Sequence, residues 1–534
     1  MGKSIESLVG HKMMLSFLGT EPTPYVLNWL QNRVAGGVTI FRYRNVESAH
    51  QVRELTDTLN RSAVQNGDLP LLIAADHEGG QLMGLGNDLT PSPGNMALGA
   101  TRSPELAFAV GQVMGTECAA LGINVDYAPS CDVNSNPQNP VIGIRSFGED
   151  PELVGEMAAA LSSGLQDAGV VSVLKHFPGH GDTQDDSHHG IPVVDAGIER
   201  LWDVELRPFQ AAIRAGAKML MSAHVGIPVL NEGKIVPSTL SYPVLHTLLR
   251  ERLGFNGVVV SDAMDMGAIK QGEAMGEDIL EAAKANLDLF LMTDSEDSHE
   301  IAYKAMIKGL QTNAISEATI KKSVDRILQL KKWVGQQKQP DMSVVRSKKH
   351  LDVVQEVANR AVTLVRNDAG LLPLQLDTDA KVAVIVPEFK ELTPADTSAS
   401  EKQSLATAVR HYHAHVDEFI VPHLPDAATI ADLRERANQY DLIIVGTIEA
   451  SRQQEQVDLV KALLDTAVPV IPVAIRTPYD LMAYPQAKTY VCTYSIQEPA
   501  MKALAAALFG EIPFKGKLPT QIPSLYTFGH AITQ

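Results

Sequence analysis

The sequence of 534 residues is poor in cysteine, with only Cys118, Cys131 and Cys492, and these have no metal-ligand spacing. Three cysteines are too few to cross-link a chain of this size, which favours a reducing compartment. The N-terminus lacks a basic region followed by an apolar core and a small-residue cleavage site. No run of about 18 apolar residues occurs anywhere in the chain. We therefore expect a cytoplasmic protein with no membrane partner.

The chain also has few cations for its number of acids. It carries 45 Lys and Arg against 63 Asp and Glu, a formal net charge of -18. Nucleic acid and anionic lipid would both be repelled by such a surface, so we expect no nonspecific binding to either. A hydrophobic content of 45% and a charged content of 20% are those of a folded soluble protein. The length predicts two or three domains rather than one core.

Short apolar runs alternate with amphipathic segments through the first part of the chain. Helical periodicity marks segments such as 104–121, 151–168 and 201–215. Repeated units of this kind, about eight in roughly 300 residues, predict a parallel (β/α)8 barrel rather than an open sheet. The predicted strands are residues 13–18, 38–41, 71–75, 123–127, 171–174, 219–222, 258–261 and 287–292.

Polar residues stand at or just past the ends of these predicted strands. In a parallel barrel the carboxyl ends of all strands form one face, and active sites lie there. The alternative is that each residue caps a following helix or ends a strand by chance. We expect instead that they share the mouth of the barrel. These residues are Asp76, Asp126, Lys175, His176, Ser222, His224 and Asp262.

A second domain is expected after a polar segment. The stretch 335–343 is polar and contains a proline, which is typical of a linker. We predict a barrel over residues 1–335, a linker over 336–352 and a smaller C-terminal α/β sandwich domain over 353–534. The sandwich is expected from strand-like runs at 382–386, 442–445, 470–475 and 490–494 and helical stretches at 428–439 and 454–466.

The segment after the strand at 171–174 is unusually rich in ionisable side chains. Prolines and glycines break it into turns at Pro178, Gly179, Gly181 and Gly190. One histidine in a surface loop would be incidental, but binding and catalytic groups gather on loops held by a rigid scaffold. We therefore predict a functional loop. Its ionisable residues are Lys175, His176, His180, Asp182, Asp185, Asp186, His188 and His189.

Two parts of this pattern suggest acid–base and nucleophilic chemistry. Asp186 lies two residues before His188, so its carboxylate can accept the ring N–H and keep the imidazole basic. Asp262 follows the strand 258–261, which would hold a carboxylate rigidly, as a nucleophile requires. Retaining glycosidases combine an acid/base with such a nucleophile, but usually both groups are carboxylates. The spacing alone does not lead to a histidine in the first role.

Several motifs, in order, resemble the β-N-acetylglucosaminidase branch of glycoside hydrolase family 3. They are DHEGG (76–80), IGIRSFGEDP (142–151), KHFPGHGDT (175–183), DSHHGIP (186–192), MSAHV (221–225) and VVVSDAMDMGAI (258–269). More faintly, AVTLVRNDAGLLPL (361–374) and GKLPTQIP (516–523) are similar to the family's C-terminal domain.

The resemblance implies retaining hydrolysis of terminal β-linked N-acetylglucosamine, from peptidoglycan fragments or chito-oligosaccharides, with no cofactor and no metal. Asp262 would be the nucleophile, His188 the acid/base and Asp186 its partner. His180, Asp182, Asp185 and His189 are expected to be loop scaffolding. The residues expected to bind the sugar are Asp76, Arg145, Lys175 and His176, and we add His224 as a further substrate-binding residue.

One position departs from the family pattern. Many members carry an arginine that reaches the sugar eight residues after the position of Asp76, and this chain has Gly84 there. Either another side chain replaces the guanidinium or the sugar specificity differs.

Other functions stay open at this point. A β-N-acetylglucosaminide phosphorylase or a β-glucosidase would use the same scaffold. A metal-dependent barrel hydrolase is a rival of another class, since clustered histidines are common in such sites, and a non-catalytic carbohydrate-binding protein is a third. His411, His413 and His415 alternate in the second domain, where a solvated face is expected rather than a metal site. The sequence leaves the oligomeric state open.

Overall fold

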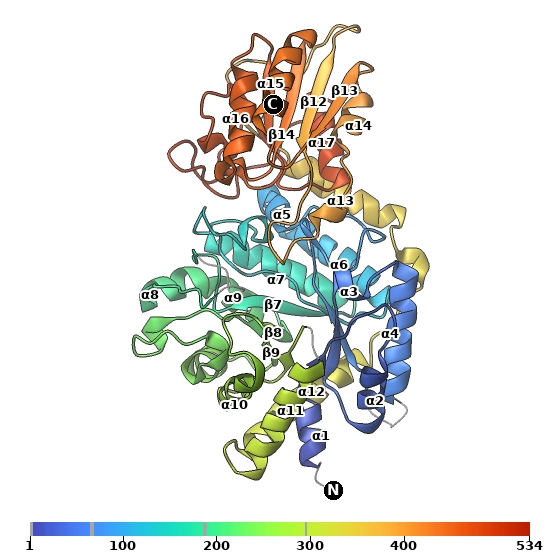
Figure 1. Cartoon of the computed structure of the whole chain (residues 1–534), viewed down its shortest axis with the longest axis vertical. Helices are drawn as coiled ribbons and strands as arrows, with labels where there is room; N and C mark the ends of the chain where they lie inside the picture. Colours follow the sequence, from blue (N-terminus) through green and yellow to red (C-terminus); the bar gives the residue numbers. More distant parts are fainter. Residues whose placement is uncertain (1–3, 65–68, 185–189, 294–295, 534) are drawn as a thin grey trace.

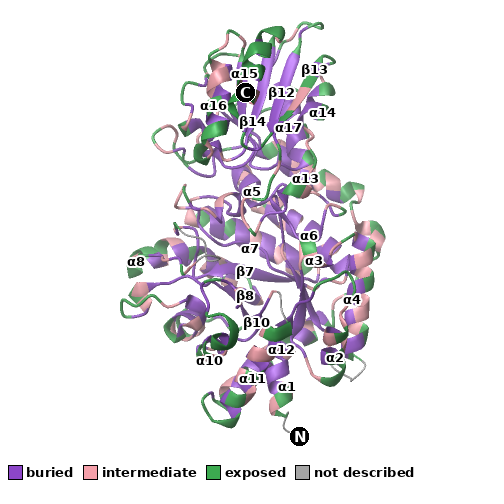
Figure 2. Cartoon of the chain, in the orientation of Figure 1, coloured by how far each residue is buried: buried purple, intermediate pink, exposed green. Residues whose placement is uncertain are grey.

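The computed structural model describes residues 4–64, 69–184, 190–293 and 296–533. Two domains follow one another along the long axis, the first blue to yellow and the second orange to red (Figure 1). The yellow helix α13 (Lys348–Ala361) lies between them. Buried residues, purple in Figure 2, make up most of the strands of both domains.

Within the described residues, eight parallel strands form the barrel in the order β10-β1-β2-β3-β6-β7-β8-β9. A bridge between Val260 and Leu289 brings the last strand to the first and nearly closes the ring. Each strand lies within, overlaps or extends one of the predicted apolar runs, so the predicted (β/α)8 barrel is confirmed. The strands are β1 (Met13–Leu15), β2 (Gly37–Ile40), β3 (Leu72–Ala75), β6 (Val125–Asp126), β7 (Val171–Phe177), β8 (Met219–Ser222), β9 (Val258–Ser261) and β10 (Phe290–Leu291).

Helices surround the barrel, and capping residues set where several of them begin. Ser103 and Asp150 accept hydrogen bonds from backbone N–H groups of the first turns of α6 and α7, each of which has proline in its first turn. The helices are α1 (Ile5–Gly10), α2 (Pro24–Asn32), α3 (Arg42–Asn45), α4 (Ala49–Val64), α5 (Asn95–Thr101), α6 (Pro104–Ala120), α7 (Pro151–Asp167), α8 (Ile198–Arg200), α9 (Arg207–Arg214), α10 (Met275–Lys284), α11 (Glu296–Gln311) and α12 (Glu317–Val334). None of the helices in the described ranges is long and apolar enough to cross a membrane.

One predicted helix differs in detail. The segment 201–215 is not continuous: a wide π-type turn over Leu201–Glu205 precedes α9. Pro208 lacks the N–H that would continue the regular hydrogen-bond ladder. A short hairpin, β4 (His77–Gly79) with β5 (Leu82–Met83), extends from the end of β3 at the barrel mouth.

The second domain contains a six-stranded sheet in the described residues, in the order β11-β16-β15-β14-β12-β13. Its edge strands, β11 and β13, were not predicted. Strand β11 begins at Thr363, two residues after the end of α13 at Ala361. The elements are β11 (Thr363–Asn367), β12 (Val382–Pro387), β13 (Val416–Val421), β14 (Leu442–Thr447), β15 (Val470–Ala474) and β16 (Thr489–Cys492), with α14 (Leu405–Arg410), α15 (Ala427–Arg436), α16 (Gln454–Leu464) and α17 (Glu498–Leu508).

The two domains share packed surfaces. Helix α13 begins at Lys348, inside the predicted linker, and packs against both α5 of the barrel region and α17 of the second domain. Met96, Ala97 and Ile144 of the first domain belong to the same apolar cluster as Tyr484 and Leu518 of the second. Contacts of this kind fix the second domain beside the barrel mouth.

Candidate active site

A cavity of about 450 Å³ lies at the carboxyl ends of the barrel strands. Five of the residues predicted from their positions or from the family motifs line it together: Asp76, Arg145, Lys175, His176 and Asp262. They come from β3, the turn at Gly143–Arg145, β7 and the end of β9. The structure therefore brings these side chains together at one mouth, where a barrel positions its active site.

Lys175, Asp76, Arg145 and Glu78 form one charged network in the wall. The Lys175 Nζ lies 2.6 Å from Asp76 Oδ1 and 2.5 Å from Glu78 Oε1. Arg145 donates to the same Glu78 carboxylate through Nη2 at 2.8 Å and Nε at 3.0 Å. Lys175, Glu78 and Arg145 are buried, whereas the Asp76 side chain is 28% exposed toward solvent. Asp76 is thus the member of this network best placed to meet a ligand.

Glu78 was not predicted as a site residue, although it lies in the DHEGG motif. Burial alone would raise the pKa of its carboxyl, but Arg145 and Lys175 outweigh burial and hold that pKa well below its usual range. Burial alone would lower the pKa of Lys175, but the Asp76 and Glu78 carboxylates raise it. Glu78 therefore keeps both cations charged and in place.

His176 is oriented by a second buried carboxylate, Asp132. Burial opposes ionisation of Asp132, but His176 and His180 lower the pKa of its carboxyl to about 2. An ionised carboxylate only accepts, so His176 Nδ1–H donates to Asp132 Oδ2 at 2.7 Å. The other ring nitrogen, Nε2, then lies 3.3 Å from Arg145 Nη2 at the cavity. Asp132 also accepts the backbone N–H of His180 at 2.7 Å.

Asp262 follows β9 and is held by its own backbone. Its N–H donates to the Ser222 carbonyl at 2.9 Å, and its Oδ1 accepts the N–H of Ala263 at 2.8 Å. The carboxylate is half-buried and lines the cavity. These two backbone hydrogen bonds hold Asp262 in one position at the edge of the cavity.

His224 lies beneath Asp262 and is fully buried. Its Nε2 donates to the Ala263 carbonyl at 2.9 Å, and its Nδ1 lies 2.9 Å from Thr239 Oγ1. Among the described residues, His224 is outside the set that lines the cavity. His224 thus supports the backbone that carries Asp262, and its predicted contact with the substrate stays a prediction.

The predicted acid/base His188 and its partner Asp186 lie outside the described residues, as do Asp185 and His189. The chain is anchored on both sides of this stretch. On one side, Asn139 Nδ2 donates to the carbonyls of His180 and Thr183 at 2.8 and 3.1 Å. On the other, the N–H of Gly226 donates to the Pro192 carbonyl at 2.8 Å. His180 lines the cavity, whereas Asp182 pairs with Arg200 at 2.9 Å.

The second domain supplies part of the cavity wall through residues 394–397, which we call the strap. The Thr397 hydroxyl accepts the N–H of Met83 at 2.9 Å, and the Thr397 N–H donates to the Gln81 carbonyl at 2.8 Å. Asp396 is held from behind by Arg476 at 2.7 Å. The strap is therefore attached to the β4–β5 hairpin next to Asp76. Sequence reasoning missed it because no motif marks a contact between residues so far apart in the chain.

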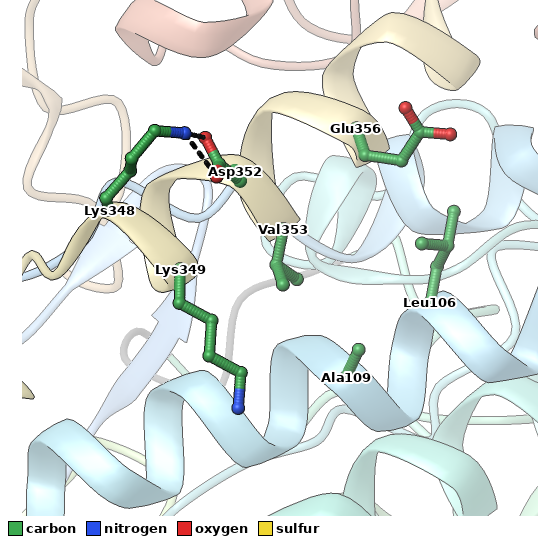
Figure 3. A pocket seen from close by; sticks show the side chains of 7 residues that line it. All are labelled: Leu106, Ala109, Lys348, Lys349, Asp352, Val353 and Glu356. Atoms are coloured by element: carbon green, nitrogen blue, oxygen red, sulfur yellow. Dashed lines mark hydrogen bonds and ion pairs between the residues drawn. The ribbon is translucent and has the colours of Figure 1, made fainter.

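A second hollow lies between α6 and α13 (Figure 3). Leu106, Ala109 and Val353 form its floor, and the Asp352 carboxylate is paired with Lys348 at 2.6 Å. Both of its carboxylates are paired with cations of α13, Asp352 with Lys348 and Glu356 with Arg360. In the parts of the chain that are described, no group of three His, Cys, Asp or Glu side chains is arranged to hold a metal ion. The barrel mouth is thus the site equipped for catalysis.

A parallel barrel hosts many kinds of reaction, and a mouth that combines carboxylates with hydrogen-bond donors is one arrangement that glycoside hydrolases use. The chain belongs to glycosyl hydrolase family 3: residues 10–330 match its N terminal domain and residues 362–528 its C-terminal domain.

Relatives match over nearly the whole chain. Beta-hexosaminidase A of Pseudoalteromonas piscicida is 31% identical over 535 residues, covering 91% of this chain and 89% of that protein. The beta-N-acetylglucosaminidase/beta-glucosidase of Cellulomonas fimi is 28% identical over 516 residues, covering 91% and 88%. The solved family 3 beta-N-acetylglucosaminidase from Paenibacillus sp. str. FPU-7 has a TM-score of 0.91 and 35% identity, covering 97% of this chain and 99% of that one.

Proposed function

We propose that the protein is a β-N-acetylhexosaminidase that releases terminal β-linked N-acetylglucosamine by hydrolysis with retention of configuration. The observation that carries this proposal is the joint placement of Asp262, Asp76, Arg145, Lys175 and His176 around one cavity at the barrel mouth. Relatives named beta-hexosaminidase and beta-N-acetylglucosaminidase match along most of the chain and support the same activity. Peptidoglycan fragments or chito-oligosaccharides are the substrates we propose, with cytoplasmic cell-wall turnover as the role.

In the first step, an Asp262 oxygen attacks the anomeric carbon, and the bond from that carbon to the leaving oxygen breaks. His188 gives its proton to the leaving oxygen, and a covalent glycosyl-aspartate is formed. In the second step, His188 removes a proton from water, which attacks the same carbon and releases Asp262. Two inversions give net retention. Asp186 accepts the His188 ring N–H and keeps the imidazole in the correct tautomer.

The sugar is held by the charged wall. Asp76 accepts hydrogen bonds from sugar hydroxyls. Lys175 and Arg145 donate to sugar oxygens, and the His176 ring offers an acceptor. Because Glu78 and Asp132 fix these groups before the substrate arrives, little reorganisation is needed on binding. The wall thus supplies orientation, and the Asp262 and His188 pair supplies the chemistry.

A panel of nitrophenyl glycosides with product configuration followed by proton NMR tests this proposal. We expect the β-N-acetylglucosaminide to be the preferred substrate and β-N-acetylglucosamine to be the first product. An initial α product would refute the mechanism, and a clear preference for the β-glucoside would refute the substrate assignment.

Phosphorolysis is tested in the same assay by adding inorganic phosphate. A hydrolase releases free sugar at a rate that phosphate does not change. Sugar 1-phosphate as the main product would instead identify a phosphorylase on this scaffold.

A further inference from the structure

Gly84 is a glycine because the backbone of Asp76 lies against it. A Cβ built on Gly84 would lie 1.8 Å from the Asp76 carbonyl oxygen and 2.8 Å from its carbonyl carbon. These are backbone atoms of the residue that meets the substrate, so they cannot move aside without displacing Asp76. No side chain, arginine included, fits at position 84 in this arrangement.

A different guanidinium reaches the same turn. Gly86, two residues on, has a φ of +90°, and a Cβ there would lie 3.3 Å from both Cζ and Nη1 of Arg42. Arg42 therefore packs on the glycine turn, and it lines the cavity together with Asp76 and Gly84. It is the first residue of the short helix α3, which follows β2, the barrel strand that neighbours β3.

Most donors of this guanidinium are unused by the protein. Among the described residues, Arg42 makes one hydrogen bond, from Nη1 to the Val46 carbonyl at 3.3 Å, and its Nε is buried without a hydrogen-bond partner. An arginine offers five N–H donors in a planar fork, and buried donors normally find acceptors. The segment around it is rigid, because Asn45 accepts the Phe41 N–H at 2.9 Å and donates to the Gly19 carbonyl at 2.9 Å.

We infer that Arg42 donates hydrogen bonds to a hydroxyl of the sugar bound beside Asp76, and that it supplies the guanidinium for which position 84 has no room. The inference rests on the proposed function. A sugar hydroxyl suits the site, because carboxylates (Asp76, Asp262, Asp265) and cations (Arg42, Arg145, Lys175) line the same cavity, and a hydroxyl can donate to the first and accept from the second. Arg42 is thus a binding and specificity residue contributed by the segment that follows β2.

Kinetics of Arg42→Met and Arg42→Lys on the nitrophenyl N-acetylglucosaminide test the inference. Methionine keeps much of the side-chain length and removes every hydrogen-bond donor, whereas lysine keeps the positive charge and loses the planar guanidinium. We expect kcat/KM to fall about 10- to 100-fold in Arg42→Met, the range for losing a hydrogen bond from a charged donor, and less in Arg42→Lys. Arg61→Ala, an exposed arginine on α4, is the control and should match the wild type.

Deoxy substrates separate binding from a structural effect. With the one deoxy analogue that lacks the contacted hydroxyl, the wild type should lose the same factor, and Arg42→Met should lose nothing further. The inference would be overturned if Arg42→Met lost the same factor in kcat/KM on every analogue, or if Arg42→Met had the kinetics of the wild type. It would also be overturned by a variant that loses only phosphate-dependent turnover, since that would make the ligand an anion. If the wild type itself is inactive on the N-acetylglucosaminide, the proposed function fails instead.

Discussion

Replacing Glu78 by glutamine tests whether the charged wall stabilises the barrel as the structure indicates. Glu78 accepts from Lys175 at 2.5 Å and twice from Arg145, and all three side chains are buried. Removing one partner of a buried ion pair costs about 3–5 kcal/mol, because an uncompensated charge stays behind. Lys175 keeps Asp76 as a partner, so we expect a loss of unfolding free energy toward the lower end, about 3 kcal/mol.

Urea unfolding followed by tryptophan fluorescence measures this loss. All three tryptophans, Trp29, Trp202 and Trp333, lie in the barrel domain, so the signal reports the unfolding of that domain. Glu281→Gln is the matched control, because it breaks an ion pair with Lys284 on the surface. The Glu281 side chain is 55% exposed and the Lys284 side chain 45%. An exposed pair contributes about 0–1 kcal/mol, so this variant should unfold nearly as the wild type does.

The pH dependence gives a second, signed expectation. Its neighbours lower the pKa of Glu78 in the folded protein, whereas an unfolded glutamate titrates at about 4.3. The stabilisation is therefore complete above about pH 5 and decreases as the pH falls through about 4 toward the folded pKa. The stability gap between wild type and Glu78→Gln should be constant from about pH 5 to 8 and should narrow below that. A gap that is absent at pH 7, or that does not change down to about pH 3.5, would refute the electrostatic reasoning.

Two further variants probe the groups that position the cavity. Thr397→Val removes the acceptor of the buried Met83 N–H, so we expect about 1–3 kcal/mol of lost stability and a raised KM, measured by urea unfolding and steady-state kinetics; an unchanged KM would show that the strap does not shape the site. Asp132→Asn replaces the carboxylate that receives His176 Nδ1–H, so kcat/KM should fall about tenfold or more while circular dichroism stays unchanged; full activity would contradict the orienting role.

Much of the barrel and of its mouth could be predicted because both follow from local patterns. Apolar runs separated by amphipathic helices predict the strands, and polar residues at the strand ends, such as Asp76, Lys175 and Asp262, meet at one face for geometric reasons. The family motifs added Arg145, which no strand end marks.

The rest depended on contacts that the sequence does not display. Asp132 lies in a loop past β6 and becomes a site residue only through the fold. Edge strand β13 has exposed and half-exposed residues at its centre, so it lacks the continuous apolar run of a buried strand. His224 stands at a strand end like its neighbours but points into packed backbone rather than into the cavity. The absence of an arginine at Gly84 was visible, whereas the Asp76 carbonyl that causes it was not.

The most direct test of the central claim is the mass of the covalent intermediate. In His188→Ala, a good leaving group departs from the nitrophenyl N-acetylglucosaminide, but the water of the second step loses its base, so the glycosyl-enzyme should accumulate. Intact-protein mass spectrometry of a quenched reaction should show one added N-acetylglucosaminyl group, and peptide mapping should place it on Asp262. Azide, which needs no deprotonation, should remove the adduct and restore turnover. An adduct on another carboxylate would contradict the account. So would the absence of any adduct together with an α-configured first product.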